Sequence, residues 1–184
     1  MAKTARNLTV AVVAMAAAIA ASQASLAADA PVTDPAPMSH VRARDPKVAA
    51  AVRSAFDRSA TFRKIVAIID ASDSYVYVDG GKCSRSVRAC FVSVTASSTN
   101  RYMRVVVDST TGELELTKLI AHELRHTIEV IAEPSVRDSA AKYHFYERTA
   151  IHTSSGTHET RAAIAAGETV RSEVKKWHGD RASD

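Results

Sequence analysis

The sequence predicts an α+β domain, and three observations lead to that class. Apolar residues recur at helical spacing from Pro46 to Asp70, and the same period returns after about Leu114. Between these two segments lie three β-rich runs joined by short polar connections. The resulting order of helices, small sheet, buried helix, connector and final helix is typical of α+β architecture.

The chain begins with the pattern of an export signal. Lys3 and Arg6 give a basic start, Leu8–Ala21 is an apolar run, and Ser25–Ala27 places small residues where a signal peptidase cleaves. An apolar run of 14 residues is too short to cross a bilayer comfortably. We therefore expect residues 1–27 to be a signal peptide and the mature protein to be periplasmic or secreted, without membrane contact.

The composition changes near residue 46 and divides the remaining chain. Four of the five prolines lie before residue 47, and residues 28–45 are rich in Pro, Ala and polar residues. Such a segment predicts a flexible linker. We expect one folded domain over residues 46–178, followed by a disordered tail over residues 179–184.

The charge pattern argues against a nucleic-acid partner. The chain has 24 Lys and Arg against 20 Asp and Glu, a formal net charge of +4, and basic residues are scattered between acids. Aromatic residues make up only 5% of the chain, which leaves no stacking platform for bases.

The first helical segment has a clear start and a candidate break. Asp45 is a plausible N-cap, and Pro46 suits the first helical position. The tripeptide Ser59–Thr61 is a candidate break that would divide the segment into two helices.

The middle of the chain predicts strands and a disulfide. The runs Tyr75–Val78, Cys90–Thr95 and Tyr102–Val107 follow one another with tight connections, so we expect a small antiparallel β-meander. Cys83 and Cys90 lie between predicted strands, and two cysteines at short range in an exported protein usually pair. A metal site using both is the alternative, but no second pair of soft ligands is near.

The second helical segment contains the motif that carries chemistry, His122-Glu-Leu-Arg-His126. Histidines four residues apart share one helical face, so both imidazoles can reach one metal ion. Glu123 is offset from that face and could instead hold a metal-bound water and take its proton. Two nitrogens, one oxygen and an open position suit Zn²⁺. The alternative is two surface histidines that flank a glutamate by chance.

This motif on a buried helix after short strands resembles the zincin metallopeptidases. More narrowly, His122–Val130 (HELRHTIEV) and Glu159–Ala163 (ETRAA) are similar to stretches of small exported bacterial zincin-like proteins without an assigned function. The resemblance covers roughly residues 75–175 and implies a minimal zincin-like fold that ends in an Ala-rich helix. Arg125 departs from the family, because peptidases usually have an uncharged residue there.

The third metal ligand must come from elsewhere in the chain. The metzincin extension is absent because Glu129 and Ala132 stand where its glycine and third histidine would be. A later carboxylate, as in gluzincins, is therefore expected. Glu159 is the first choice, since it opens the Ala-rich helix, and Glu147 is the alternative, 21 positions after His126.

Other polar residues have weaker assignments. Glu129 lies three residues past His126 and is either an acceptor that orients a ligand histidine or a satisfied polar residue at the helix edge. Spacing does not choose among the candidates for a group that steadies the oxyanion of peptide hydrolysis, which are Tyr143, His144, Tyr146, His152 and His158.

The function expected from these residues is that of an exported zinc-dependent metallopeptidase, a hydrolase of peptide or protein substrates that uses a metal-activated water. The alternative is a catalytically silent zincin-like module that binds metal or protein, which Arg125 and the small size favour. The sequence assigns no oligomeric state.

Overall fold

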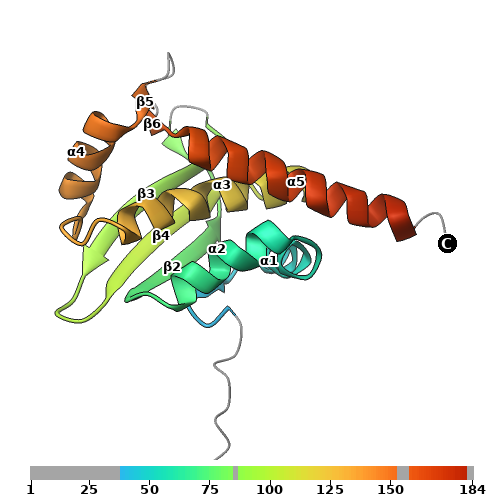
Figure 1. Ribbon diagram of the computed structural model, residues 1–184, viewed down its shortest axis with the longest axis horizontal. Coiled ribbons are helices and arrows are strands. Elements are labelled where there is room, and N and C mark those ends of the chain that lie inside the picture. Colours follow the sequence, from blue (N-terminus) through green and yellow to red (C-terminus); the bar gives the residue numbers. More distant parts are fainter. Residues whose placement is uncertain (1–37, 85–86, 153–157, 182–184) are drawn as a thin grey trace, which may run out of the picture. The chain divides into compact units, whose positions relative to one another are not determined.

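The computed structural model describes residues 38–84, 87–152 and 158–181, and it shows an α+β domain with helices packed on one face of a mixed sheet (Figure 1). The expected signal peptide, residues 1–27, lies outside the described residues. Among the helices that the structure describes, none combines the length and apolar composition needed to span a membrane.

Two helices follow a short first strand, α1 (Pro46–Arg58) and α2 (Ala60–Asp70). Asp45 caps α1 as expected, because its carboxylate accepts from the backbone N–H groups of Lys47 and Val48. Ser59 ends α1 and caps α2, and its hydroxyl accepts from the N–H of Phe62. The break expected at residues 59–61 is therefore confirmed.

The main sheet has four strands in the order β1-β2-β4-β3. Their bounds are Val41–Ala43 for β1, Ser74–Gly80 for β2, Ala89–Ala96 for β3 and Arg101–Val107 for β4. The expected antiparallel meander is wrong in its pairing, because β4 lies between β2 and β3 and pairs with β2 in parallel. Only the β3–β4 hairpin is antiparallel. Local patterns predicted the strands, but a strand's neighbours depend on the path of the connections.

The expected linker is shorter than predicted. Its end, Val41–Ala43, forms β1 and pairs in parallel with β2. The carboxylate of Asp70 holds this segment by accepting from the backbone N–H groups of Met38 and His40. Val41 is buried, so a short stretch of apparent linker is part of the core.

The second half of the domain is mainly helical. Its elements are α3 (Glu113–Ile131), α4 (Ser139–Thr149), β5 (Ile151–His152), β6 (His158–Glu159) and α5 (Arg161–Arg181). The buried helix is confirmed, because α3 buries residues on most of its length between the sheet and α5. Glu159 was expected to open the last helix but lies in β6, and residues 179–181 belong to α5 rather than to a tail.

Two contacts fix α3 in place. Arg101 of β4 is only 4% exposed, and its guanidinium donates to the backbone carbonyls of Val130 and Ile131 near the C-terminal end of α3. At the other side, a Cβ on Gly167 of α5 would lie 3.0 Å from the carbonyl oxygen of Lys118. Glycine thus permits a close approach between α3 and α5.

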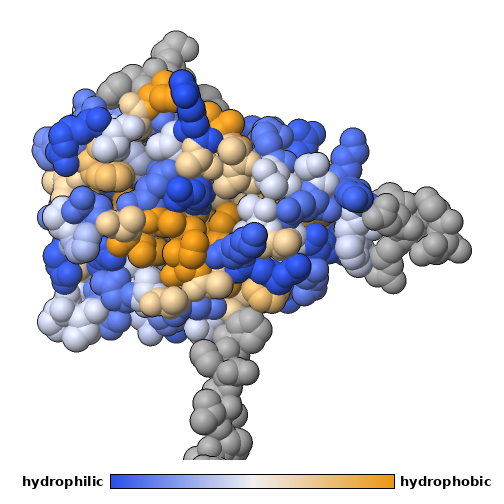
Figure 2. Space-filling model, viewed as in Figure 1, coloured by the Kyte–Doolittle hydropathy of each residue, from blue (hydrophilic) through white to orange (hydrophobic). Residues whose placement is uncertain are grey.

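The predicted disulfide is confirmed, since Cys83 and Cys90 are bonded across the β2–β3 connection. On the helical side of the domain, apolar surface gathers between α2 and α3, with hydrophilic residues around it (Figure 2).

Candidate metal centre

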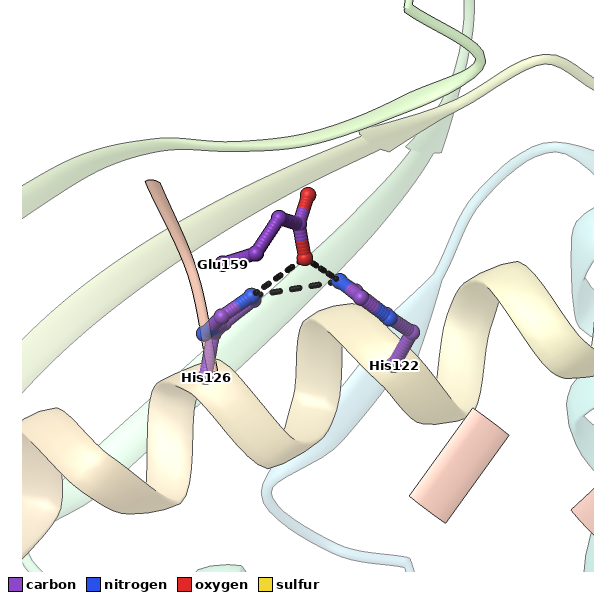
Figure 3. Close-up of side chains that lie close together, drawn as sticks. All are labelled: His122, His126 and Glu159. Atoms are coloured by element: carbon purple, nitrogen blue, oxygen red, sulfur yellow. Dashed lines mark hydrogen bonds and ion pairs between the residues drawn. The ribbon is translucent and has the colours of Figure 1, made fainter. Parts of the chain in front are cut away.

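Three side chains from two separate segments meet above α3. Nε2 of His122 lies 3.2 Å from Nε2 of His126 and 2.8 Å from Oε2 of Glu159, and the third edge of this triangle is 3.7 Å (Figure 3). Glu159, the first choice for the third ligand, therefore joins the two histidines. Among the described residues, this is a group whose ligand atoms could hold a metal ion.

The geometry of this triad fits a metal better than a set of hydrogen bonds. Oε2 of Glu159 is buried, and no aligned hydrogen bond from the described residues reaches it, although His122 is so near. Ligand atoms at tetrahedral angles and about 2.1 Å from zinc lie about 3.4 Å apart. The observed edges of 2.8, 3.2 and 3.7 Å bracket that value. The three atoms therefore point to a shared centre.

The two segments are positioned by helix geometry and by a cap. The one-turn spacing on α3 places His122 and His126 on the same face. Glu159 lies in β6, which pairs with β5, and the next residue, Thr160, precedes α5. The Thr160 hydroxyl accepts from the N–H of Ala163, as an N-cap does, so the start of α5 holds Glu159 over α3.

Glu129 connects three elements around His126. Its Oε2 accepts from Nδ1 of His126 at 3.0 Å, and its Oε1 accepts from the Thr160 hydroxyl at 2.6 Å. The hydroxyl of Tyr146 on α4 donates to the backbone carbonyl of His126. A carboxylate can only accept, so Nδ1 carries the hydrogen and Nε2 of a neutral ring is left to bind metal.

Charges in the triad reinforce one another. Burial lowers the pKa of His126, but Glu129 and Glu159 more than offset this and raise it to about 9. Burial raises the pKa of Glu159, but His122 and His126 more than offset this and lower it to about 2. Without a metal, the cluster is therefore held as an imidazolium–carboxylate network, whose proton a bound cation displaces.

Glu123 is buried, at 5% exposure, and lines both cavities beside the triad. Burial raises the pKa of this carboxyl, and the nearby His126 and His122 counteract only part of the rise. Glu123 is not part of the three-atom cluster, in keeping with its expected offset from the ligand face.

Two cavities flank the triad. The larger, about 400 Å³, lies between β3 and α4 and includes His126, Tyr143, Tyr146 and His158 in its wall. The smaller, about 280 Å³, is lined by α3 and α5 residues and includes His122. Glu123 and Glu159 face both cavities, so a ligand in either can reach the candidate centre.

Several predicted residues lie outside the triad. Glu147, the alternative ligand, instead contacts Nε2 of His158 through Oε1, at 2.6 Å. Tyr146 donates to a backbone carbonyl, and His144 is not part of either cavity wall. Tyr143 and His158 remain at the larger cavity, and the side chain of His152 is outside the described residues.

Arg125, the departure from the zincin pattern, does not line either cavity. Burial raises the pKa of Glu129, but hydrogen bonds from His126 and Thr160 more than offset this. The charge of His126 and, to a smaller extent, that of Arg125 lower the pKa further. The charge of Arg125 therefore acts on Glu129, the hydrogen-bond partner of His126, and Arg125 does not block the cavities beside the ligand atoms.

Two residues of the site, Thr160 and Lys142, were not predicted from the sequence. Thr160 had a detectable signal, since a threonine before an Ala-rich helix is a common N-cap. Lys142 in the larger cavity had none, because α4 has no regular apolar face and its partner β3 is distant in sequence.

The chain was also compared with protein-family models, with curated proteins and with solved structures, and none of these matched it.

Proposed function

We propose that this protein is an exported zinc-dependent metallopeptidase that hydrolyses peptide bonds. One observation carries the proposal: His122, His126 and Glu159 converge on one point, and the buried Glu123 lies next to them at two cavities. The resemblance of the motif to the zincins supports the same reading.

Each residue has a distinct role in this proposal. His122, His126 and Glu159 would hold Zn²⁺, which supplies Lewis-acid activation of a water and of the scissile carbonyl. Glu123 takes the proton of the attacking water and passes it to the leaving amine. Its raised pKa suits both transfers, because a general base and acid works best when its pKa is near the working pH.

The export part of the proposal rests on the apolar segment in residues 1–27 and on the Cys83–Cys90 disulfide. Disulfides persist mainly in oxidising compartments.

A non-catalytic module that binds metal or protein is the second candidate, and one observation favours it. Side chains of α4 occupy the outer edge of β3: Lys142 donates to the carbonyls of Phe91 and Val92, and Ser139 accepts from the N–H of Val94. An extended peptide could not pair with these groups while α4 holds them.

The experiment that separates the two candidates combines metal analysis with activity. Elemental analysis of the purified protein should give about one zinc per chain, retained in Glu147→Ala and lost in Glu159→Ala. On a broad peptide library, Glu123→Gln should keep its zinc and lose about 10²–10⁴-fold in hydrolysis rate. Zinc without hydrolysis in the wild type supports a metal-binding module, and no zinc after refilling contradicts the enzyme and leaves a module that binds protein.

A further inference from the structure

Lys142 places a positive charge in the wall of the larger cavity, which it shares with Glu123 and His126. Its ammonium donates to the carbonyls of Phe91 and Val92 and lies 4.5 Å from the centre of the Phe91 ring. These contacts hold the charge at the edge of β3. An ammonium has three N–H donors, so two backbone contacts leave one for a ligand.

This cation has no carboxylate partner within ion-pair distance among the described residues. The smaller cavity differs, because its cations are matched: Arg88 lies 3.5 Å from Glu115, and Lys118 lies 2.6 Å from Glu168. A half-buried cation without a counter-ion is costly, and a ligand carboxylate would relieve that cost.

Lys142 also keeps most of its charge near neutral pH. Burial lowers the pKa of its ammonium, the negative charge of Glu123 counteracts part of this, and the result is about 8. The imidazole of His158, on the same wall, already contacts the carboxylate of Glu147. Within the described part of the chain, the larger cavity therefore differs from the smaller one in having a cation without a carboxylate partner, and that cation is Lys142.

We propose that Lys142 forms a subsite for a carboxylate of the substrate, so that the site selects peptides that place an acidic group in the larger cavity. This inference rests on the proposed function and names its substrate class. The carboxylate comes from an Asp or Glu side chain or from a free C-terminus.

The test measures binding of two matched metal-directed probes to the zinc-loaded protein by calorimetry. One probe is succinic acid monohydroxamate, and the other is its neutral amide. We expect the carboxylate probe to bind about tenfold more tightly, as a charge-assisted hydrogen bond permits. Lys142→Met should abolish this preference, Lys142→Arg should restore it, and Lys118→Met in the smaller cavity should retain it.

Two peptide hydroxamates identify the source of the carboxylate: one has an internal Asp and an amidated C-terminus, the other a neutral side chain and a free C-terminus. Preference for one of them over a neutral amidated peptide supports the subsite and names its source. Equal affinity for all probes, or a preference that survives in Lys142→Met, overturns it.

Zinc content and thermal unfolding, recorded on every sample, separate the possible failures. Zinc bound without any carboxylate preference overturns the subsite alone. Absence of zinc overturns the metal centre and the subsite together. Lys142→Arg covers the case in which Lys142→Met fails to fold.

Discussion

The orientation of the His126 ring depends on a carboxylate one turn further along the same helix. Glu129 accepts from His126 and from Thr160, so α3 and the residue before α5 share one acceptor. Groups of this kind commonly change metal affinity without touching the metal, because they fix the tautomer and direction of the ligand.

Replacing Glu129 by Gln tests this support. The amide can accept only one such hydrogen bond well and has no charge, so we expect zinc affinity to fall about 10–100-fold. Competition with a chromophoric chelator measures the change. Glu133→Gln, two residues after the end of α3, is the control, and equal affinities in both variants would contradict the role of Glu129.

The residues at this site differ in how well a sequence can predict them. His122, His126 and Glu129 share one helix, where spacing alone places them on one face. Glu159 needed an argument from the zincin resemblance, since a partner 33 positions after His126 has no local signal. Thr160 has a local signal as an N-cap, but its contact with Glu129 depends on tertiary packing, and so does the place of Lys142 at the larger cavity.

The raised pKa of His126 predicts how the stability of the metal-free protein depends on pH. A group with a folded-state pKa of about 9 binds its proton more tightly in the folded chain than in the unfolded chain, where the pKa is 6.5. Its contribution is complete below pH 6.5 and is lost as the pH rises to about 9. Glu123, with a raised pKa, acts in the same direction.

Chemical denaturation of the metal-free protein between pH 6.5 and 8 should therefore show a falling free energy of unfolding, with at most about 3 kcal/mol lost by pH 9. Above about pH 8 the lowered pKa of Lys142 makes the free energy of unfolding rise with pH, which opposes the effect of His126. The range from pH 6.5 to 8 is therefore the informative one. With saturating zinc the fall should disappear, because the ligand rings must then be neutral. A metal-free stability that rises across this window would contradict the network.

At the scale of elements, the contact between α3 and α5 positions the ligand helix. The two helices approach closely at Gly167, where an added Cβ would lie 3.0 Å from the Lys118 carbonyl and 3.3 Å from Cβ of His122. The first of these is backbone within a helix, which cannot move aside as a flexible side chain can. The second belongs to a ligand residue.

Gly167→Ala should therefore destabilise the domain, even though alanine favours helix formation. The helical preference is worth about 1 kcal/mol, and overpacking costs about 1–3 kcal/mol. We expect a net loss of about 1 kcal/mol together with weaker zinc binding, measured by urea denaturation and chelator competition. Thr169→Ala, at an exposed position of the same helix, should change neither, and a stabilised Gly167→Ala would show that α5 can shift.

The sheet shows where local patterns stop being informative. Each of its longer strands was predicted, since β-rich runs with turn residues around them are local features. The parallel pairing of β2 with β4 was not, because it depends on β3 taking the edge position. The three residues of β1 were also missed, since a strand of that length has too few residues to show alternation.

For the whole molecule, the candidate metal centre acts as a cross-link. Its ligands belong to α3 and to β6, and α4 lies between them in the chain. The Cys83–Cys90 bond closes only the short β2–β3 connection, so it constrains a different and more local part of the unfolded chain. Metal binding requires the folded arrangement of both distant segments, and it should therefore stabilise the domain as a unit.

Thermal unfolding with increasing zinc measures this coupling. A ligand that binds only the folded chain at 100 times its Kd adds about 2.7 kcal/mol, and for a domain of this size the melting temperature should rise by about 5–10 °C. The rise should be absent in His122→Ala/His126→Ala and reversed by a chelator. It should persist in Glu123→Gln, because Glu123 is assigned to proton transfer and not to the metal. A rise of equal size in the double variant would place the zinc elsewhere and remove the basis of the proposed enzyme.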